Sequence, residues 1–187
     1  MRRAIRQADE TLRANEADFR ASFYSSAVGQ AQVDPATGRY VRVNQKFCDI
    51  TGYSEDELLG MTFTDLTHPY DRANDAVAHG RMIRGEIREV SREKRYIRKD
   101  GRVVWIDISA SLVRDAAGQP LRTLGVVQDI TARKEAEEAQ HSAEAKFRRL
   151  VEQSLVGIYI IQDDRYVYVN PKMTEIFGRS QDALTSA

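Results

Sequence analysis

The stretch YVRVNQKFCDITGYSEDEL at residues 40–58 returns as YVYVNPKMTEIFGRSQDAL at residues 166–184. The segments before these stretches match as well: FRASFYSSAVGQAQVD spans residues 19–34, and FRRLVEQSLVGIYIIQ spans residues 147–162. The offset between the copies is 147 − 19 = 128 residues at the start and 166 − 40 = 126 residues later. Solenoid repeats are only about 20 to 50 residues long, so this spacing predicts two copies of one domain.

The two copies differ in length. The first continues for about 70 residues beyond Leu58, whereas the second ends at Ala187, so we expect the second copy to be truncated. The predicted organisation is an N-terminal helix at residues 1–18, a complete domain at 19–131, a linker helix at 132–153 and the N-terminal half of a second domain at 154–187.

The first half of the complete domain predicts two short strands followed by short helices. The strands span about residues 29–34 and 39–43, and the turn signal PATG joins them. Asn44 has the side chain to cap a short helix that Gly52 ends. A capping box at residues 54–57 opens one more helical turn, which stops near Gly60.

The second half predicts a longer helix and three strands. The helix spans about residues 70–83, and the strands span about 87–98, 103–114 and 121–130. In the middle strand apolar residues alternate with polar ones, so an antiparallel sheet with one buried face is expected. The fold class is therefore α+β, a five-stranded antiparallel sheet with flanking short helices, to which the N-terminal and linker helices are added.

The N-terminal helix, predicted over residues 2–19, carries residues at steps of three and four, as in a coiled-coil seam: Ile5, Ala8, Leu12, Asn15 and Phe19. Asn15 would be a polar seam residue that fixes register. The alternative is an amphipathic helix that lies on its own domain. The linker helix has an alanine-rich seam of the same spacing, so we expect a homodimer assembled through both helices.

Composition narrows the class of protein. The chain has 187 residues, of which 42% are hydrophobic and 30% charged, so a folded core is expected. Lys+Arg 28 balances Asp+Glu 28, which argues against a nucleic-acid binder. There is no apolar run of the roughly 20 residues that span a bilayer and no signal-peptide core, and the single Cys48 permits no internal disulfide. The expected setting is the cytoplasm, or the cytoplasmic part of a larger protein.

Four pieces of sequence occur in an informative order: YVRVN at residues 40–44, ITGYSEDELLG at 50–60, RKDGRVVW at 98–105 and GVVQDIT at 125–131. Together they resemble the PAS domain family, in full over residues 19–131 and in part over 147–187. The resemblance implies a dimeric sensor domain, used in tandem and joined by helices to an output domain. Such outputs are histidine kinases, diguanylate cyclases or phosphodiesterases, and transcription regulators.

Two cofactors of this family can be compared with the residues present. Flavin photoreceptors of the family carry a reactive cysteine shortly after the glycine that matches Gly60. Phe63 stands at that place and Cys48 is expected to be a small core residue, so covalent flavin is not expected. Haem-binding members use a histidine on the long helix. His68 is expected in the turn before this helix and His79 on its flank, half in water, beside an apolar stripe of Ala73, Ala76, Val77 and Gly80, so haem is not expected either.

No residue pattern predicts catalysis. The carboxylate clusters have no adjacent base, metal-ligand spacing or phosphate loop, so neither a catalytic nor a metal site is expected. A basic stretch could hold an anionic ligand or partner, although a solvated strand face is the favoured interpretation: Arg92, Lys94, Arg95, Arg98, Lys99 and Arg102. Trp105 could stack on a planar cofactor or pack against a flanking helix or a partner chain.

These patterns favour a sensory and regulatory module. A signal, such as a small ligand between the sheet and the helices, would pass through a joint where the last strand meets the linker helix. This joint is Asp129-Ile130-Thr131: Ile130 would be anchored in the sheet, and Asp129 or Thr131 would cap the helix. The absent output would be a histidine kinase or a diguanylate cyclase/phosphodiesterase. The alternative is a ligand-free scaffold that holds two chains together.

Overall fold

The computed structural model describes residues 2–185, which divide into two compact units that meet between Ala132 and Arg133. The first unit contains, in order, α1 (Arg2–Tyr24), β1 (Gly29–Val33), β2 (Tyr40–Val43), α2 (Gln45–Thr51), α3 (Glu55–Leu59), α4 (Phe63–Leu66), α5 (Pro69–Ile83), β3 (Glu89–Ile97), β4 (Val103–Arg114) and β5 (Pro120–Asp129). Helix α6 (Thr131–Glu152) begins at the end of the first unit and continues into the second unit.

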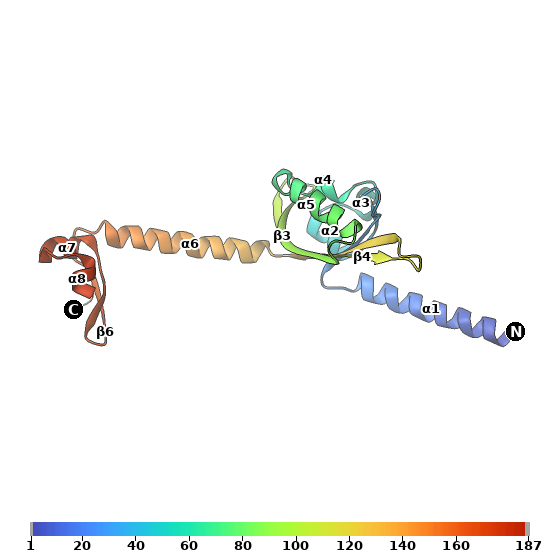
Figure 1. The fold of residues 1–187 in the computed structure, drawn as a ribbon, viewed down its shortest axis with the longest axis horizontal. Coiled ribbons are helices and arrows are strands. Elements are labelled where there is room, and N and C mark those ends of the chain that lie inside the picture. The colour runs from blue at the N-terminus through green and yellow to red at the C-terminus, as the bar shows by residue number, and fades with distance from the viewer. Residues whose placement is uncertain (1, 186–187) are drawn as a thin grey trace. The chain divides into compact units, whose positions relative to one another are not determined.

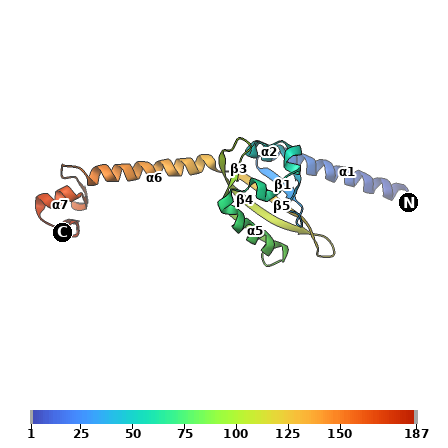
Figure 2. The same ribbon diagram turned by 90° about the horizontal axis from the view of Figure 1, so that it is seen from above.

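The five strands of the first unit form one antiparallel sheet in the order β2-β1-β5-β4-β3. Helices α2 to α5 gather on one face of this sheet, as Figures 1 and 2 show. Side chains from this inner face and from the helices form the core, in which Phe47, Leu58, Leu66 and Ile106 are fully buried. The predicted fold class, a five-stranded antiparallel sheet with flanking short helices, is confirmed.

The helix ends follow the capping chemistry of the sequence. The Asn44 side chain accepts a hydrogen bond from the Phe47 amide, and Gly52 ends α2 with a left-handed φ of 78°. Ser54 and Glu57 form the predicted capping box of α3. A second capping box, between Thr62 and Asp65, begins α4. This helix was not predicted, because it has only four residues.

Helix α1 continues to Tyr24, five residues beyond the predicted end at Phe19. The extension has a physical cause, because Phe23 is 3% exposed and its carbonyl accepts a hydrogen bond of 3.0 Å from Asn44 Nδ2. The last turn of the helix is thus attached to the domain. The side chains of Ile5, Ala8 and Leu12, three members of the predicted seam, lie outside the described residues.

The second unit repeats the beginning of the first. Its hairpin of β6 (Tyr159–Gln162) and β7 (Arg165–Val169) precedes α7 (Pro171–Phe177) and α8 (Gln181–Thr185). Its buried cluster is small and consists of Val169, Met173 and Leu184, with Tyr166 packed against them. None of the helices within residues 2–185 combines the length and the apolar character that a membrane span requires.

Candidate functional site

A cavity of about 70 Å³ lies between the inner face of the sheet and the helices. Its floor includes a row of small residues that are in register across three strands: Ala31 on β1, Gly125 on β5 and Ala110 on β4. A Cβ atom built on Gly125 would meet no atom closer than 3.8 Å. Space is therefore left where larger side chains would otherwise fill the gap under the helices.

Three residues that line the cavity carry buried polar atoms without a hydrogen-bond partner in the described protein: His79 Nε2, Arg92 Nε and Thr123 Oγ1. Buried polar atoms are nearly always hydrogen-bonded, because leaving one unpaired costs about 1–3 kcal/mol. Their concentration around one cavity indicates that a polar molecule, either a ligand or ordered water, completes the site.

One side of the cavity is charged. Asp75 on α5 is 3% exposed and contacts both Arg92 and Lys94 of β3. It also accepts a hydrogen bond of 2.8 Å from Thr67 Oγ1. Burial, reinforced by the adjacent Arg92 guanidinium, lowers the pKa of Lys94 to about 7, whereas contact with Asp75 favours its charged form. Two cationic side chains thus share one buried carboxylate.

The structure corrects one expectation for this region and adds a contact to another. The apolar stripe predicted for α5 is wrong, since Val77 is 63% exposed while Asp75 and Met82 face the core. His79 also faces the cavity, with its ring 4.9 Å from that of Phe63, and burial lowers its pKa. A helix that packs on cationic strand residues turns its acidic side inward, which a hydrophobicity pattern does not reveal.

The basic stretch is likewise not a uniformly solvated strand face. Alternation along β3 points Arg92 and Lys94 inward, together with Tyr96, and leaves Arg95 on the other face. The remaining members, Arg98, Lys99 and Arg102, follow β3 or lie in the hairpin turn. The favoured interpretation is therefore wrong for the two residues that the strand buries.

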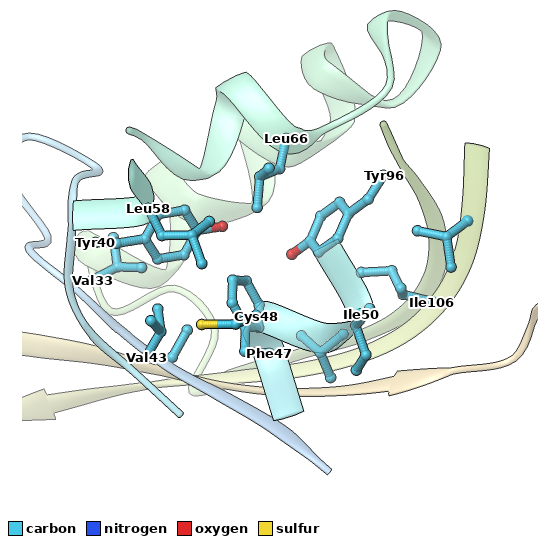
Figure 3. Packing of buried hydrophobic residues seen from close by; sticks show 13 residues of the cluster. Val33, Tyr40, Val43, Phe47, Cys48, Ile50, Leu58, Leu66, Tyr96 and Ile106 are labelled. Carbon is cyan, nitrogen blue, oxygen red and sulfur yellow. The ribbon is translucent and has the colours of Figure 1, made fainter. Parts of the chain in front are cut away.

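Aromatic side chains close another side of the cavity. The hydroxyl groups of Tyr40 and Tyr96 point toward one another across the core, as Figure 3 shows. Burial raises the pKa of both hydroxyls, so they are neutral hydrogen-bonding groups at any physiological pH. Cys48 is buried in the same core, as predicted, and burial raises its pKa too.

The residues of the predicted joint contact strand β4. Ile130 is 6% exposed and its amide donates to the Trp105 carbonyl at 2.9 Å. The Trp105 amide in turn donates to Thr131 Oγ1 at 3.0 Å, and Asp129 Oδ1 accepts from the Thr131 amide at 2.9 Å. Sequence reasoning did not connect Trp105 with this joint, because the pairing depends on strand register.

Side-chain contacts also connect α5 with the joint. Asp71, one turn before Asp75, accepts hydrogen bonds from Arg95 Nε at 3.0 Å and from Arg95 Nη2 at 2.9 Å. The Arg95 guanidinium lies 5.2 Å from the centroid of the Trp105 ring. A helix that lines the cavity is thus in contact, through Arg95 and Trp105, with the strand that holds the start of α6.

The other candidate residues lie apart from the cavity. Asn15 is exposed, and Phe19 is 39% exposed with the Arg42 guanidinium 5.2 Å from its ring centroid. His68 caps α5, its Nδ1 accepting from the Tyr70 amide at 3.4 Å. Within the part of the chain that the structure describes, no cluster of His, Cys, Asp or Glu side chains could hold a metal ion.

Comparison with known proteins agrees with this architecture. Residues 40–127 match the family model "PAS fold", and residues 145–186 match the family model "PAS domain". The chain is 34% identical over 156 residues to a probable diguanylate cyclase, DgcE, of Escherichia coli, and 28% identical over 156 residues to the sensor histidine kinase TmoS of Ectopseudomonas mendocina. Each match covers 83% of this chain, but only 14% and 16% of the two relatives.

A solved PAS domain from Colwellia psychrerythraea has the same fold, with a TM-score of 0.58 at 21% identity over 64% of this chain and 98% of that one. The chain belongs to the PAS domain family and is a sensory signal-transduction module. Sensory domains of this family are usually non-catalytic and commonly dimerise.

Proposed function

We propose that the first unit senses a small molecule in its cavity and passes the signal through Asp129, Ile130 and Thr131 to helix α6. The observation that carries this proposal is the set of three partnerless buried polar atoms around one cavity. A ligand that engages them pulls on α5 or β3, and α5 reaches Trp105 through the Asp71–Arg95 pair. A small displacement there changes how α6 leaves the sheet.

In this proposal the chain, with the complete domain at residues 19–131 and the linker at 132–153, has no catalytic residues of its own. It acts as a cytoplasmic homodimer whose helices control an output domain. The two relatives, a probable diguanylate cyclase and a sensor histidine kinase, support an output of either kind. The competing function is a scaffold that binds no ligand.

Trp105 offers a direct test because it is the only tryptophan of the chain. The purified protein is analysed by native mass spectrometry for a retained molecule, and its fluorescence is recorded before and after that molecule is removed by unfolding and refolding. Sensing predicts a retained small molecule and a shift in Trp105 emission on its removal.

Ala110→Leu, which fills the floor of the cavity, should abolish both the retained molecule and the emission shift. Ser109→Leu, on the outer face of the same strand, is the matched control and should keep both. A protein that retains nothing and whose Trp105 emission responds to no added small molecule is a scaffold.

A further inference from the structure

The cavity also carries information on the chemistry of its ligand. Its charged side has two cations, Arg92 and Lys94, against the single carboxylate of Asp75. The nearby Asp71 attracts both cations but is also held by Arg95, so three cations still face two carboxylates. A buried surplus of positive charge is costly, and it is relieved either by loss of the Lys94 proton or by a bound anion.

The unpaired atoms favour the same class of ligand. Arg92 Nε is a donor and cannot accept, so its missing partner is a hydrogen-bond acceptor. The hydroxyl of Thr123 can donate as well. Charge-assisted hydrogen bonds from a guanidinium are strongest to carboxylate and phosphate oxygens.

Size and polarity restrict the anion further. Because a water molecule needs about 10–15 Å³, a cavity of about 70 Å³ holds a ligand of about five or six non-hydrogen atoms. Away from Arg92 the floor is apolar and made of Ala31, Ala110 and Gly125. A short aliphatic part fits there, whereas a second charged group would be left without a partner.

We propose that the cavity binds a short-chain monocarboxylate, whose carboxylate accepts hydrogen bonds from Arg92 and whose aliphatic part lies over the row of small residues on β1, β5 and β4. This inference rests on the proposed sensory function and specifies its ligand class. An occupant of this size binds in the micromolar to millimolar range.

The test measures binding to the 187-residue chain by isothermal titration calorimetry in a carboxylate-free buffer. The probes are acetate, propionate, butyrate and pyruvate, with propionamide and propanol as neutral analogues of similar size. At least one carboxylate should bind with a dissociation constant below about 1 mM, and its neutral analogue should bind at least tenfold more weakly.

Two variants separate the carboxylate contacts from general stability. Arg92→Gln leaves the Asp75–Lys94 pair in place and should weaken carboxylate binding by at least tenfold. Arg88→Gln, an exposed arginine just before β3, is the matched control and should change nothing.

The pH dependence gives an independent readout. The titratable and charged groups around Lys94 are Asp71, Asp75 and His79 on α5, Arg92 and Tyr96 on β3, and Tyr40 on β2. A bound anion favours protonated Lys94, whose pKa is about 7 in the free protein. Binding should therefore take up protons, and the affinity should fall as the pH rises from about 7 to 9.

The proposal is overturned if the carboxylates bind no more tightly than their neutral analogues. It is also overturned if they bind the Arg92→Gln variant with the same affinity as the unsubstituted chain. The absence of any binding tighter than about 1 mM overturns it as well, since ordered water then completes the cavity. A different retained molecule that shifts Trp105 emission would refute the carboxylate class and leave the sensory function intact.

Discussion

The Asp71–Arg95 pair joins helix α5 to strand β3 at a place where a single carboxylate makes several contacts. Asp71 accepts from the Arg95 backbone amide at 3.0 Å in addition to the guanidinium. The two side chains are 21% and 28% exposed, so solvent screens the pair only partly. Hydrogen bonding to Arg95 lowers the pKa of Asp71.

Replacing this carboxylate has a predictable effect. A group whose pKa is lowered in the folded state contributes stability above its unfolded pKa and loses that contribution as the pH falls. Asp71→Asn should thus lower the free energy of unfolding by about 1–2 kcal/mol at pH 7, and the difference should begin to disappear below about pH 4. Urea denaturation from pH 7 down to about pH 3, which spans the titration of an unfolded Asp near pH 4, measures this.

The exposed Asp49 provides the control. Its carboxylate contacts Gln45 of its own helix and no strand, so Asp49→Asn removes a carboxylate without breaking a helix–strand pair. A loss of stability in Asp71→Asn that stays constant across the whole pH range would contradict an electrostatic origin and would indicate altered packing instead.

Single residues were predictable from the sequence where they interact with neighbours a few positions away in the chain. Asn44 and Ser54 cap helices through neighbours three positions away, so the sequence alone predicts them. The cavity was not predictable in the same way, because Ala31, Gly125 and Ala110 meet only through the register of three strands. The inward position of Asp75 depends on partners that follow it by about twenty residues.

At the scale of elements, the strands were predicted well because alternation in β4 and the turns around it are local signals. The C-terminal end of α1 and the existence of α4 were not predicted, since both depend on contacts with the rest of the domain. Within the described residues, helix α1 contacts the domain through its last turn and through the Phe19 ring, which faces the Arg42 guanidinium. Its residues from Arg13 to Tyr24 are exposed apart from Phe23.

The exposed length of α1 makes the predicted seam testable. Asn15→Leu would replace a polar seam residue with an apolar one, which in a coiled coil increases association and weakens register. We expect a dimer at least tenfold tighter, or larger oligomers, by sedimentation equilibrium. Ala17→Leu, on the opposite side of the helix, is the control that should leave the mass unchanged. If both variants behave alike, Asn15 lies outside any seam.

At the scale of the whole molecule, each unit has its own copy of the same hydrogen-bond network, and the two copies differ in the packing around them. Asn170 Oδ1 accepts from the Ile158 and Met173 amides at 2.8 and 3.0 Å, and Nδ2 donates to two carbonyls at 3.0 Å each. Asn44 makes the same four contacts in the first unit. The network is therefore a property of the repeated sequence.

The surroundings decide what the network contributes to stability. In the first unit the network connects α1, β1 and α2, and the sheet of this unit has five strands. Within the described part of the second unit, the sheet has two strands, and a set of apolar side chains is about half exposed: Tyr159, Ile160, Ile161, Val167, Ile176 and Phe177. Two-stranded hairpins are only marginally stable in water.

Matched substitutions should separate the two units. Asn44→Ala leaves four backbone groups without their partner, so it should lower the stability of the main unfolding transition by about 3 kcal/mol. Asn170→Ala removes the same contacts from the second unit and should leave that transition unchanged, because a weakly packed hairpin adds little to it. Its effect should be faster amide hydrogen exchange confined to residues 157–185. An Asn170→Ala variant that lowers the main transition as much as Asn44→Ala would show instead that the two units unfold as one cooperative body, and that the apolar surface of the second unit is covered in solution.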